Sequence, residues 1–167
     1  LLFDGGLAFL ALTVALWRRA PLGLVAAQVL GALFTALFTG LWPVAEIPSL
    51  LPLLAAFLVI TIAAERAELA QLTMGKRAVP TLLGLGSLMA LGAMVSLGLP
   101  DMGSRVVGFA CLVIAAWLLR DDVGRRMIRT DGLRRYNAAA LLAGNGWLAV
   151  AGIVWLVVGQ PTSSGAY

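Results

Sequence analysis

Three charged residues within four positions are the first candidates for chemistry in this sequence. Glu65, Arg66 and Glu68 follow a long apolar run in the stretch ITIAAERAELAQLT, residues 60–73. On a helix the two carboxylates would share one face, and Arg66 would lie about 100° away from Glu65. Carboxylates and an arginine inside a membrane could line a proton or cation path. The same residues could instead form a solvated helix end that pairs with basic loops, or a binding surface for a partner subunit.

Two asparagines in the last apolar block are the other polar candidates. Asn137 lies near the start of this block, and Asn145 lies deepest in it, between Gly144 and Gly146. Asparagine side chains in membrane helices usually form hydrogen bonds between helices. Asn145 is therefore expected either to join two helices or to act as a functional polar group within the bilayer.

The residue types needed for catalysis and metal binding are scarce. The chain has no histidine and one cysteine, Cys111, in the middle of an apolar block. It therefore provides no histidine ligand for haem, copper or zinc, and it cannot form an internal disulfide. No phosphate-binding loop or nucleophile elbow is present. We predict no catalytic, cofactor or metal residue, a buried Cys111, and haem or copper only if other chains or a further segment hold it.

The composition defines the environment of these residues. The 167-residue chain is 61% hydrophobic and 12% charged, whereas soluble domains are about 45–50% apolar and about 25% charged. Its apolar blocks are continuous and long enough to cross the hydrocarbon layer as helices, and they lack the alternation of a β-barrel. We predict an all-α, polytopic transmembrane bundle forming a single domain over residues 1–167. The six predicted spans are about 2–17, 22–42, 49–64, 79–99, 104–120 and 136–159.

The basic residues predict the orientation of the bundle. All of them except Arg105 fall in the connections after the first, third and fifth spans. Cytoplasmic loops carry the excess of lysine and arginine. We therefore predict a protein of the bacterial cytoplasmic membrane whose two chain ends face away from the cytoplasm. The net charge of +4 then reflects topology and not nucleic-acid binding. The residues predicted to contact lipid headgroups, or an acidic partner, are Arg120, Arg125, Arg126, Arg129, Arg134 and Arg135.

Small and aromatic residues predict how the spans pack. Gly86 and Ala90 in the fourth span, like Ala139 and Ala143 in the sixth, are four residues apart. This spacing lets helix backbones approach closely, so both spans should be central or dock tightly on neighbours. The tryptophans near span ends, Trp17, Trp42 and Trp117, suit an interfacial belt. Trp147 lies in mid-span and is expected to pack within the protein or, alternatively, to contact a cofactor.

Two stretches resemble a known family. LLAAFLVITIAAERAELAQL, residues 53–72, contains a Glu-Arg-x-Glu turn that closes a helix. Residues 111–156 contain an Arg-Asp pair, an arginine-rich loop and a helix with glycines and tryptophans. Together they resemble a bacterial family of multi-pass membrane proteins distantly similar to NnrS-type proteins, which are linked to haem, copper and nitric oxide stress. The resemblance implies relatives with histidines in further helices, which this chain does not have.

These features predict an integral membrane protein with a structural or accessory role. It would be a subunit of a membrane assembly, or the scaffold half of an NnrS-like protein, packed against other membrane chains or itself. Two alternatives remain: a small-solute or proton transporter that uses Glu65, Glu68 and Asn145, and a haem- or copper-linked redox protein. The chain begins in an apolar block at Leu1 without a methionine, which suggests a fragment or a processed chain.

Overall fold

The computed structural model is entirely helical over the residues it describes, which are 2–16, 22–69, 77–121, 124–129 and 131–160. Its long helices follow one another along the chain, separated by short connections. Their bounds are α1 Leu2–Leu16, α2 Leu22–Leu41, α3 Ile47–Leu69, α5 Ala78–Val95, α6 Pro100–Asp121 and α8 Leu133–Val158. A single short turn of helix, α7 Gly124–Met127, precedes α8.

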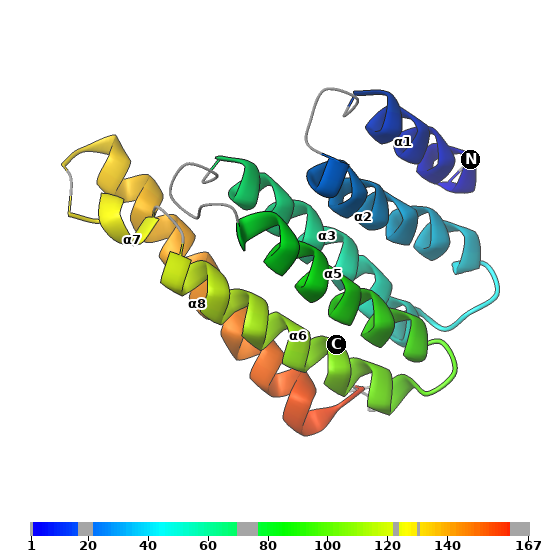
Figure 1. The fold of residues 1–167 in the computed structure, drawn as a ribbon. Coiled ribbons are helices and arrows are strands. Elements are labelled where there is room, and N and C mark those ends of the chain that lie inside the picture. Colours follow the sequence, from blue (N-terminus) through cyan, green and yellow to red (C-terminus); the bar gives the residue numbers. More distant parts are fainter. Residues whose placement is uncertain (1, 17–21, 70–76, 122–123, 130, 161–167) are drawn as a thin grey trace.

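The helices pack side by side and alternate in direction (Figure 1). α2, α3, α5 and α6 form the centre of the bundle, because α3 packs against α2, α5 and α6, and α5 against α2 and α6. Among the long helices, α1 contacts mainly α2, and α8 contacts mainly α6. The core lies between the central helices and contains Leu24, Phe34, Leu53, Met89 and Ile114. The first and last helices therefore flank the bundle on opposite sides.

Five of the helices, α2, α3, α5, α6 and α8, are long and apolar enough to cross a membrane. The first predicted span, residues 2–17, corresponds to α1, which is apolar but has only 15 residues. At 1.5 Å per residue it extends about 22 Å, less than the hydrocarbon thickness of about 30 Å. The prediction of an all-α helical bundle is thus confirmed, with five helices long and apolar enough to span a membrane.

The helix bounds differ from the predicted spans at three places. α3 runs to Leu69, because the residues after Ala64 are mostly strong helix formers; Glu65, Arg66 and Glu68 are therefore within the helix. α5 ends at Val95, and α6 begins at Pro100, since proline suits the first position of a helix better than the end of one. α8 likewise starts three residues early, at Leu133.

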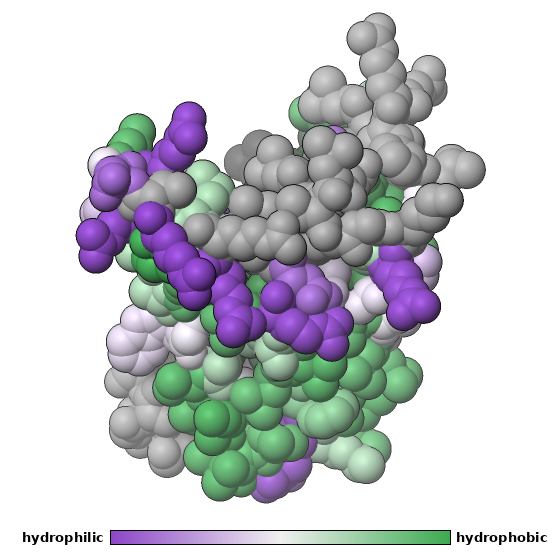
Figure 2. Space-filling model, turned by 60° about the vertical axis from the view of Figure 1, so that its left-hand side comes forward, coloured by the Kyte–Doolittle hydropathy of each residue, from purple (hydrophilic) through white to green (hydrophobic). Residues whose placement is uncertain are grey.

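Charged residues gather at the two ends of the bundle. One end carries the C-termini of α3 and α6 and the N-termini of α5 and α8, and with them Arg66, Arg77, Arg120 and the arginines of residues 125–135. Figure 2 shows a hydrophilic band at this end above a broad hydrophobic surface. The opposite end carries Asp4, Glu46, Asp101 and Arg105. Arg18, Arg19 and Lys76 lie outside the described residues.

Glycines bring α6 into close contact with α5 and α8. A Cβ on Gly92 of α5 would lie 2.9 Å from the backbone nitrogen of Val107. A Cβ on Gly108 would lie 2.8 Å from the carbonyl oxygen of Gly152 in α8. Ordinary carbon contacts are about 3.5–4.0 Å, so these helix surfaces meet through backbone atoms. α5 is central and α8 is at the edge, but neither helix docks through its predicted pair of small residues: a Cβ on Gly86 would come no closer than 4.0 Å to Leu30, and Ala139 and Ala143 are exposed.

Candidate functional site: a polar groove between α3 and α8

A groove of about 590 Å³ opens between α3 and α8, with α6 at its base. Its walls are mostly apolar, and three polar side chains reach it: Glu65 and Arg66 from α3 and Asn145 from α8. Glu65 and Arg66, two of the three charged residues predicted as candidates, therefore meet Asn145 of the last span. The apolar lining consists of Val59, Ile62, Leu118, Ala140, Leu141, Gly144, Trp147, Leu148 and Ala151.

The groove exists because α8 docks on α6 by a narrow stripe. Gly108 and Gly152 set the crossing, and a Cβ on Gly152 would also lie 3.0 Å from Cγ of Leu112. The two helices are antiparallel, so residues that follow Gly108 in α6 lie opposite residues that precede Gly152 in α8. Asn145 therefore lies at the level of Ala115, in the middle of α6. The side of α8 next to this stripe faces α3 across the groove and does not pack against it.

Arg66 is the most unusual member of the groove. Its side chain is partly buried, and its Nε atom is buried without a hydrogen-bond partner. Among the residues that the structure describes, none forms an ion pair with it. A buried polar hydrogen that lacks an acceptor destabilises a fold by about 1–3 kcal/mol. The Nε–H of this guanidinium is therefore a donor for which the described bundle provides no acceptor.

The other candidate residues are divided between the groove and the surface. Glu65 is exposed and reaches the groove, whereas Glu68 is exposed and lies outside its lining. Asn145 is half-buried in the lining, and Asn137 is exposed near the start of α8, outside it. Within the described residues, no ion pair joins either glutamate to the basic segment after α6. The arrangement is thus one carboxylate, one guanidinium and one amide in an apolar groove.

The arginines of the basic end form a separate, exposed group. Arg120 closes α6 and is paired with Asp121 through two hydrogen bonds of 2.8 Å, from Nε to Oδ1 and from Nη2 to Oδ2. Arg125, Arg129, Arg134 and Arg135 are exposed on and after α7 and on the first turn of α8. The side chain of Arg126 lies outside the described residues. Exposed arginines at the end of an apolar bundle can bind lipid phosphates or acidic partners.

The outer face of α8 carries a regular row of residues that was not predicted, although the residue spacing in the sequence displays it. A row of small and β-branched residues runs along it at alternating intervals of four and three residues, which is the heptad spacing of packed helices. We call this row the α8 seam: Ala139, Ala143, Gly146, Val150, Ile153 and Val157. All but Gly146 are classed as exposed, and nothing lies within 4 Å of a Cβ placed on Gly146. Only 6% of the α8 span is buried, against 33% to 56% for the other four long spans.

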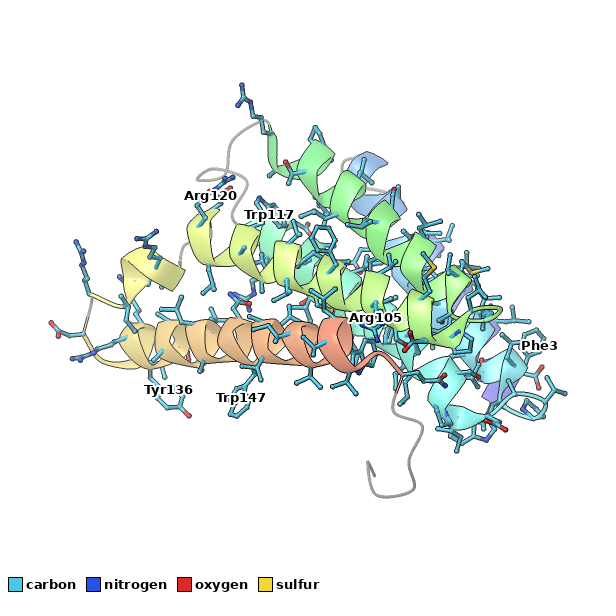
Figure 3. All side chains as sticks on the ribbon, turned by 90° about the horizontal axis from the view of Figure 1, so that it is seen from below. Phe3, Arg105, Trp117, Arg120, Tyr136 and Trp147 are labelled. Carbon is cyan, nitrogen blue, oxygen red and sulfur yellow. The ribbon has the colours of Figure 1, made fainter. Side chains whose placement is uncertain are left out.

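Two tryptophan predictions are wrong. Trp117 is buried in the core with 7% of its surface exposed, because α6 is packed between other helices of the bundle. Trp147 is 73% exposed and does not pack within the protein. Figure 3 shows Trp147 and Tyr136 projecting from α8 on the side away from α6. Cys111 is buried, as predicted.

At the opposite end of the bundle, Arg105 closes α8, a role that the sequence did not indicate. Its Nη1 atom donates hydrogen bonds to the carbonyl oxygens of Leu156 and Val157, at 3.0 and 3.1 Å. Its Nε atom donates to Oδ2 of Asp101 at 3.0 Å. The last carbonyls of a helix have no partner within the helix, so this arginine caps α8 and attaches its end to α6 (Figure 3).

We expect Arg105→Leu to lower the free energy of unfolding by about 1–2 kcal/mol, since it removes charged hydrogen bonds to two helix carbonyls. Thermal unfolding in mild detergent, followed by tryptophan fluorescence, would measure this change. Asp101→Asn is the matched control and should cost less than about 1 kcal/mol, because the ion pair that it removes is exposed. Equal losses in the two variants would contradict the capping role.

The described residues contain no group of three or more His, Cys, Asp or Glu side chains that could hold a metal ion. Five long apolar helices with charges at both ends place the chain in the class of helical membrane proteins. The chain belongs to the family described as a domain of unknown function, DUF8744, whose model matches residues 1–167. No curated protein and no solved structure matches it.

Proposed function

We propose that the chain is an accessory subunit or scaffold of a membrane assembly, and that a transmembrane helix of another chain packs on the α8 seam. The observation that carries this proposal is the low burial of α8, 6% of its span, together with the heptad spacing of its outer face. Membrane helices associate through small residues that let backbones approach. Ala139, Ala143 and Gly146 provide such a surface in the half of α8 near the basic end.

The side chains of the seam differ from the large exposed side chains of α5 and α6. None of the latter is branched at Cβ; examples are Leu91, Met94 and Phe109. The other half of the seam is formed by Val150, Ile153 and Val157, which are branched at Cβ and have few rotamers. Stiff side chains lose little entropy when a partner packs on them. The seam therefore suits a protein partner better than fluid lipid.

Trp147 supports the same proposal. Tryptophans that face lipid concentrate at the membrane interfaces, whereas Trp147 lies at the level of Val113, in the middle of α6. Its side chain is 73% exposed and points away from the bundle (Figure 3). Exposed tryptophans that insert into a partner are often the strongest contacts of an interface.

In this proposal the basic end faces the cytoplasm of a bacterial cytoplasmic membrane, and both ends of the described chain face away from it. The gathering of arginines at one end supports this orientation. The resemblance of residues 53–72 and 111–156 to NnrS-like proteins suggests one kind of partner, a chain or segment that carries the histidines this sequence does not have. Haem or copper would then be held by that partner.

Ala143→Leu tests the proposal, because a leucine at the centre of the seam would separate two packed backbones. We expect it to weaken association by about tenfold or more, given overpacking costs of about 1–3 kcal/mol. Native mass spectrometry after mild extraction from native membranes would record the fraction of chain in complexes. Ala26→Leu, at an exposed position on α2, is the control. A wild-type chain that occurs only as a monomer would overturn the proposal.

A second candidate is a small-solute or proton transporter, since Glu65 and Asn145 line one groove. Glu68 does not reach that groove, so this candidate would depend on a single carboxylate. Glu65→Gln in proteoliposomes should abolish proton-coupled uptake if the carboxylate carries the proton. Uptake equal to wild type in the Glu65→Gln and Asn145→Ala variants would remove this candidate.

A further inference from the structure

The groove between α3 and α8 has the features of a lipid-binding site, independently of what packs on the α8 seam. Arg66 is three residues from the end of α3, about 5 Å along the helix axis. It is therefore near the membrane surface at the basic end, where lipid phosphates lie. Its Nε atom is buried and has no hydrogen-bond partner. A guanidinium binds phosphate oxygens with two parallel hydrogen bonds, so a phosphate would satisfy the group that the bundle leaves unpaired.

The rest of the groove fits the remainder of a phospholipid. It extends from Ala140 to Ala151 on α8, about 16 Å along that helix. Below Arg66 its walls are apolar and include Val59, Ile62 and Leu148. Asn145 lies part of the way down with no hydrogen bond to another described residue, and its amide could donate to an ester carbonyl. The cavity volume, about 590 Å³, is within the usual range of small-molecule sites.

Glu65 restricts the headgroup. It lies beside Arg66 in the groove, so the two charges of the site sum to zero. An anionic headgroup without an amine would have its phosphate on Arg66 and its remaining polar groups against a carboxylate. A headgroup with a phosphate and a primary ammonium would pair both charges at once, because the ammonium donates hydrogen bonds to carboxylate oxygens.

We propose that this groove binds one aminophospholipid of the phosphatidylethanolamine type. Its phosphate pairs with Arg66, its ammonium with Glu65, and one acyl chain lies along the apolar wall between α3 and α8. The bound lipid fills the space between these two helices and provides an acceptor for the buried Nε–H of Arg66.

Native mass spectrometry of the full chain tests this proposal. The purified protein is stripped of lipid by detergent exchange, and phosphatidylethanolamine, phosphatidylglycerol or phosphatidylcholine with identical acyl chains is added. We expect one phosphatidylethanolamine to bind in preference to the other two. Arg66→Gln should weaken its binding by about tenfold or more, the loss expected for a charged hydrogen bond. Arg77→Gln, an exposed basic residue at the same end and outside the groove, should bind as the wild type does.

Glu65→Gln provides an independent variant, since Glu65 is exposed and its loss should leave the bundle folded. We expect it to keep phospholipid binding and to lose the preference for phosphatidylethanolamine over phosphatidylglycerol. The deacylated headgroup, glycerophosphoethanolamine, should not compete, because it lacks the chain that occupies the apolar wall. Equal binding of the three lipids to the wild type, or unchanged selectivity in Glu65→Gln, would overturn the proposal even if Arg66→Gln does not fold.

Discussion

Gly152→Val should separate α8 from α6 and lower the free energy of unfolding by about 3 kcal/mol, the upper part of the usual range for overpacking. The position has no space for a side chain, because its Cβ would lie 2.8 Å from the carbonyl oxygen of Gly108 and 3.1 Å from the nitrogen of Leu112. Backbone atoms cannot move aside as a flexible side chain can. Among the long helices α8 contacts mainly α6, so no other long helix would hold it in place.

The matched control is Gly146→Val, the same substitution on the same helix. A Cβ on Gly146 would have nothing within 4 Å, so the isolated chain should unfold at the wild-type temperature. Tryptophan fluorescence during heating in mild detergent compares the two variants. Because Gly146 belongs to the α8 seam, this control should also lose partner association. Equal destabilisation by the two valines would contradict the glycine contact between α6 and α8.

Gly103→Val should have a similarly large effect at the turn between α5 and α6. A Cβ at this position would collide with the backbone nitrogen and Cα of Ser96. Ser96 is fully buried, and its hydroxyl donates a 2.7 Å hydrogen bond to the carbonyl of Ala93. The turn therefore cannot open without breaking the end of α5. We expect a loss of about 3 kcal/mol or more and a sharp decrease in monodisperse protein.

The control for this turn is Gly84→Val, because nothing lies within 4 Å of a Cβ at Gly84 in α5. The two variants share the added side chain and the helical context, so the difference between them measures the contact alone. Size-exclusion chromatography after extraction from the membrane gives the fraction of folded chain. A Gly103→Val protein that elutes with wild-type yield and profile would show that the α5 to α6 turn tolerates a side chain.

The sequence predicted the helical fold well, because the hydrophobic runs are long and the breaks between them carry proline, glycine or charge. The predicted helix ends were wrong where a residue type is compatible with more than one position in a helix. Pro100 could end one helix or begin the next, and the structure shows that it begins α6. The third span was predicted to end at about residue 64, whereas α3 continues to Leu69, since alanine, glutamate, arginine and leucine are strong helix formers; Glu65, Arg66 and Glu68 lie on a helix, as their predicted shared face requires.

The groove could be predicted only in part. Composition identified Glu65, Arg66 and Asn145 as candidates, but their meeting depends on how α8 lies across α6. Gly108 and Gly152 determine that contact, and they are 44 residues apart in the sequence. Trp147 shows the same limit, because a tryptophan in mid-span can face the core or the outside, and only the crossing at Gly152 decides which. The α8 seam, in contrast, is a local spacing that the sequence alone displays.

The measurement that tests the central claim most directly is photo-crosslinking in native membranes. A benzophenone amino acid replaces Ala143 at the centre of the α8 seam, and in a separate variant it replaces Leu91, an exposed residue of α5. If the seam packs on another transmembrane helix, the probe at residue 143 yields a discrete protein adduct, and the probe at residue 91 yields lipid adducts. Lipid adducts alone at both positions would show that α8 faces the bilayer and would contradict the role of this chain as an assembly subunit.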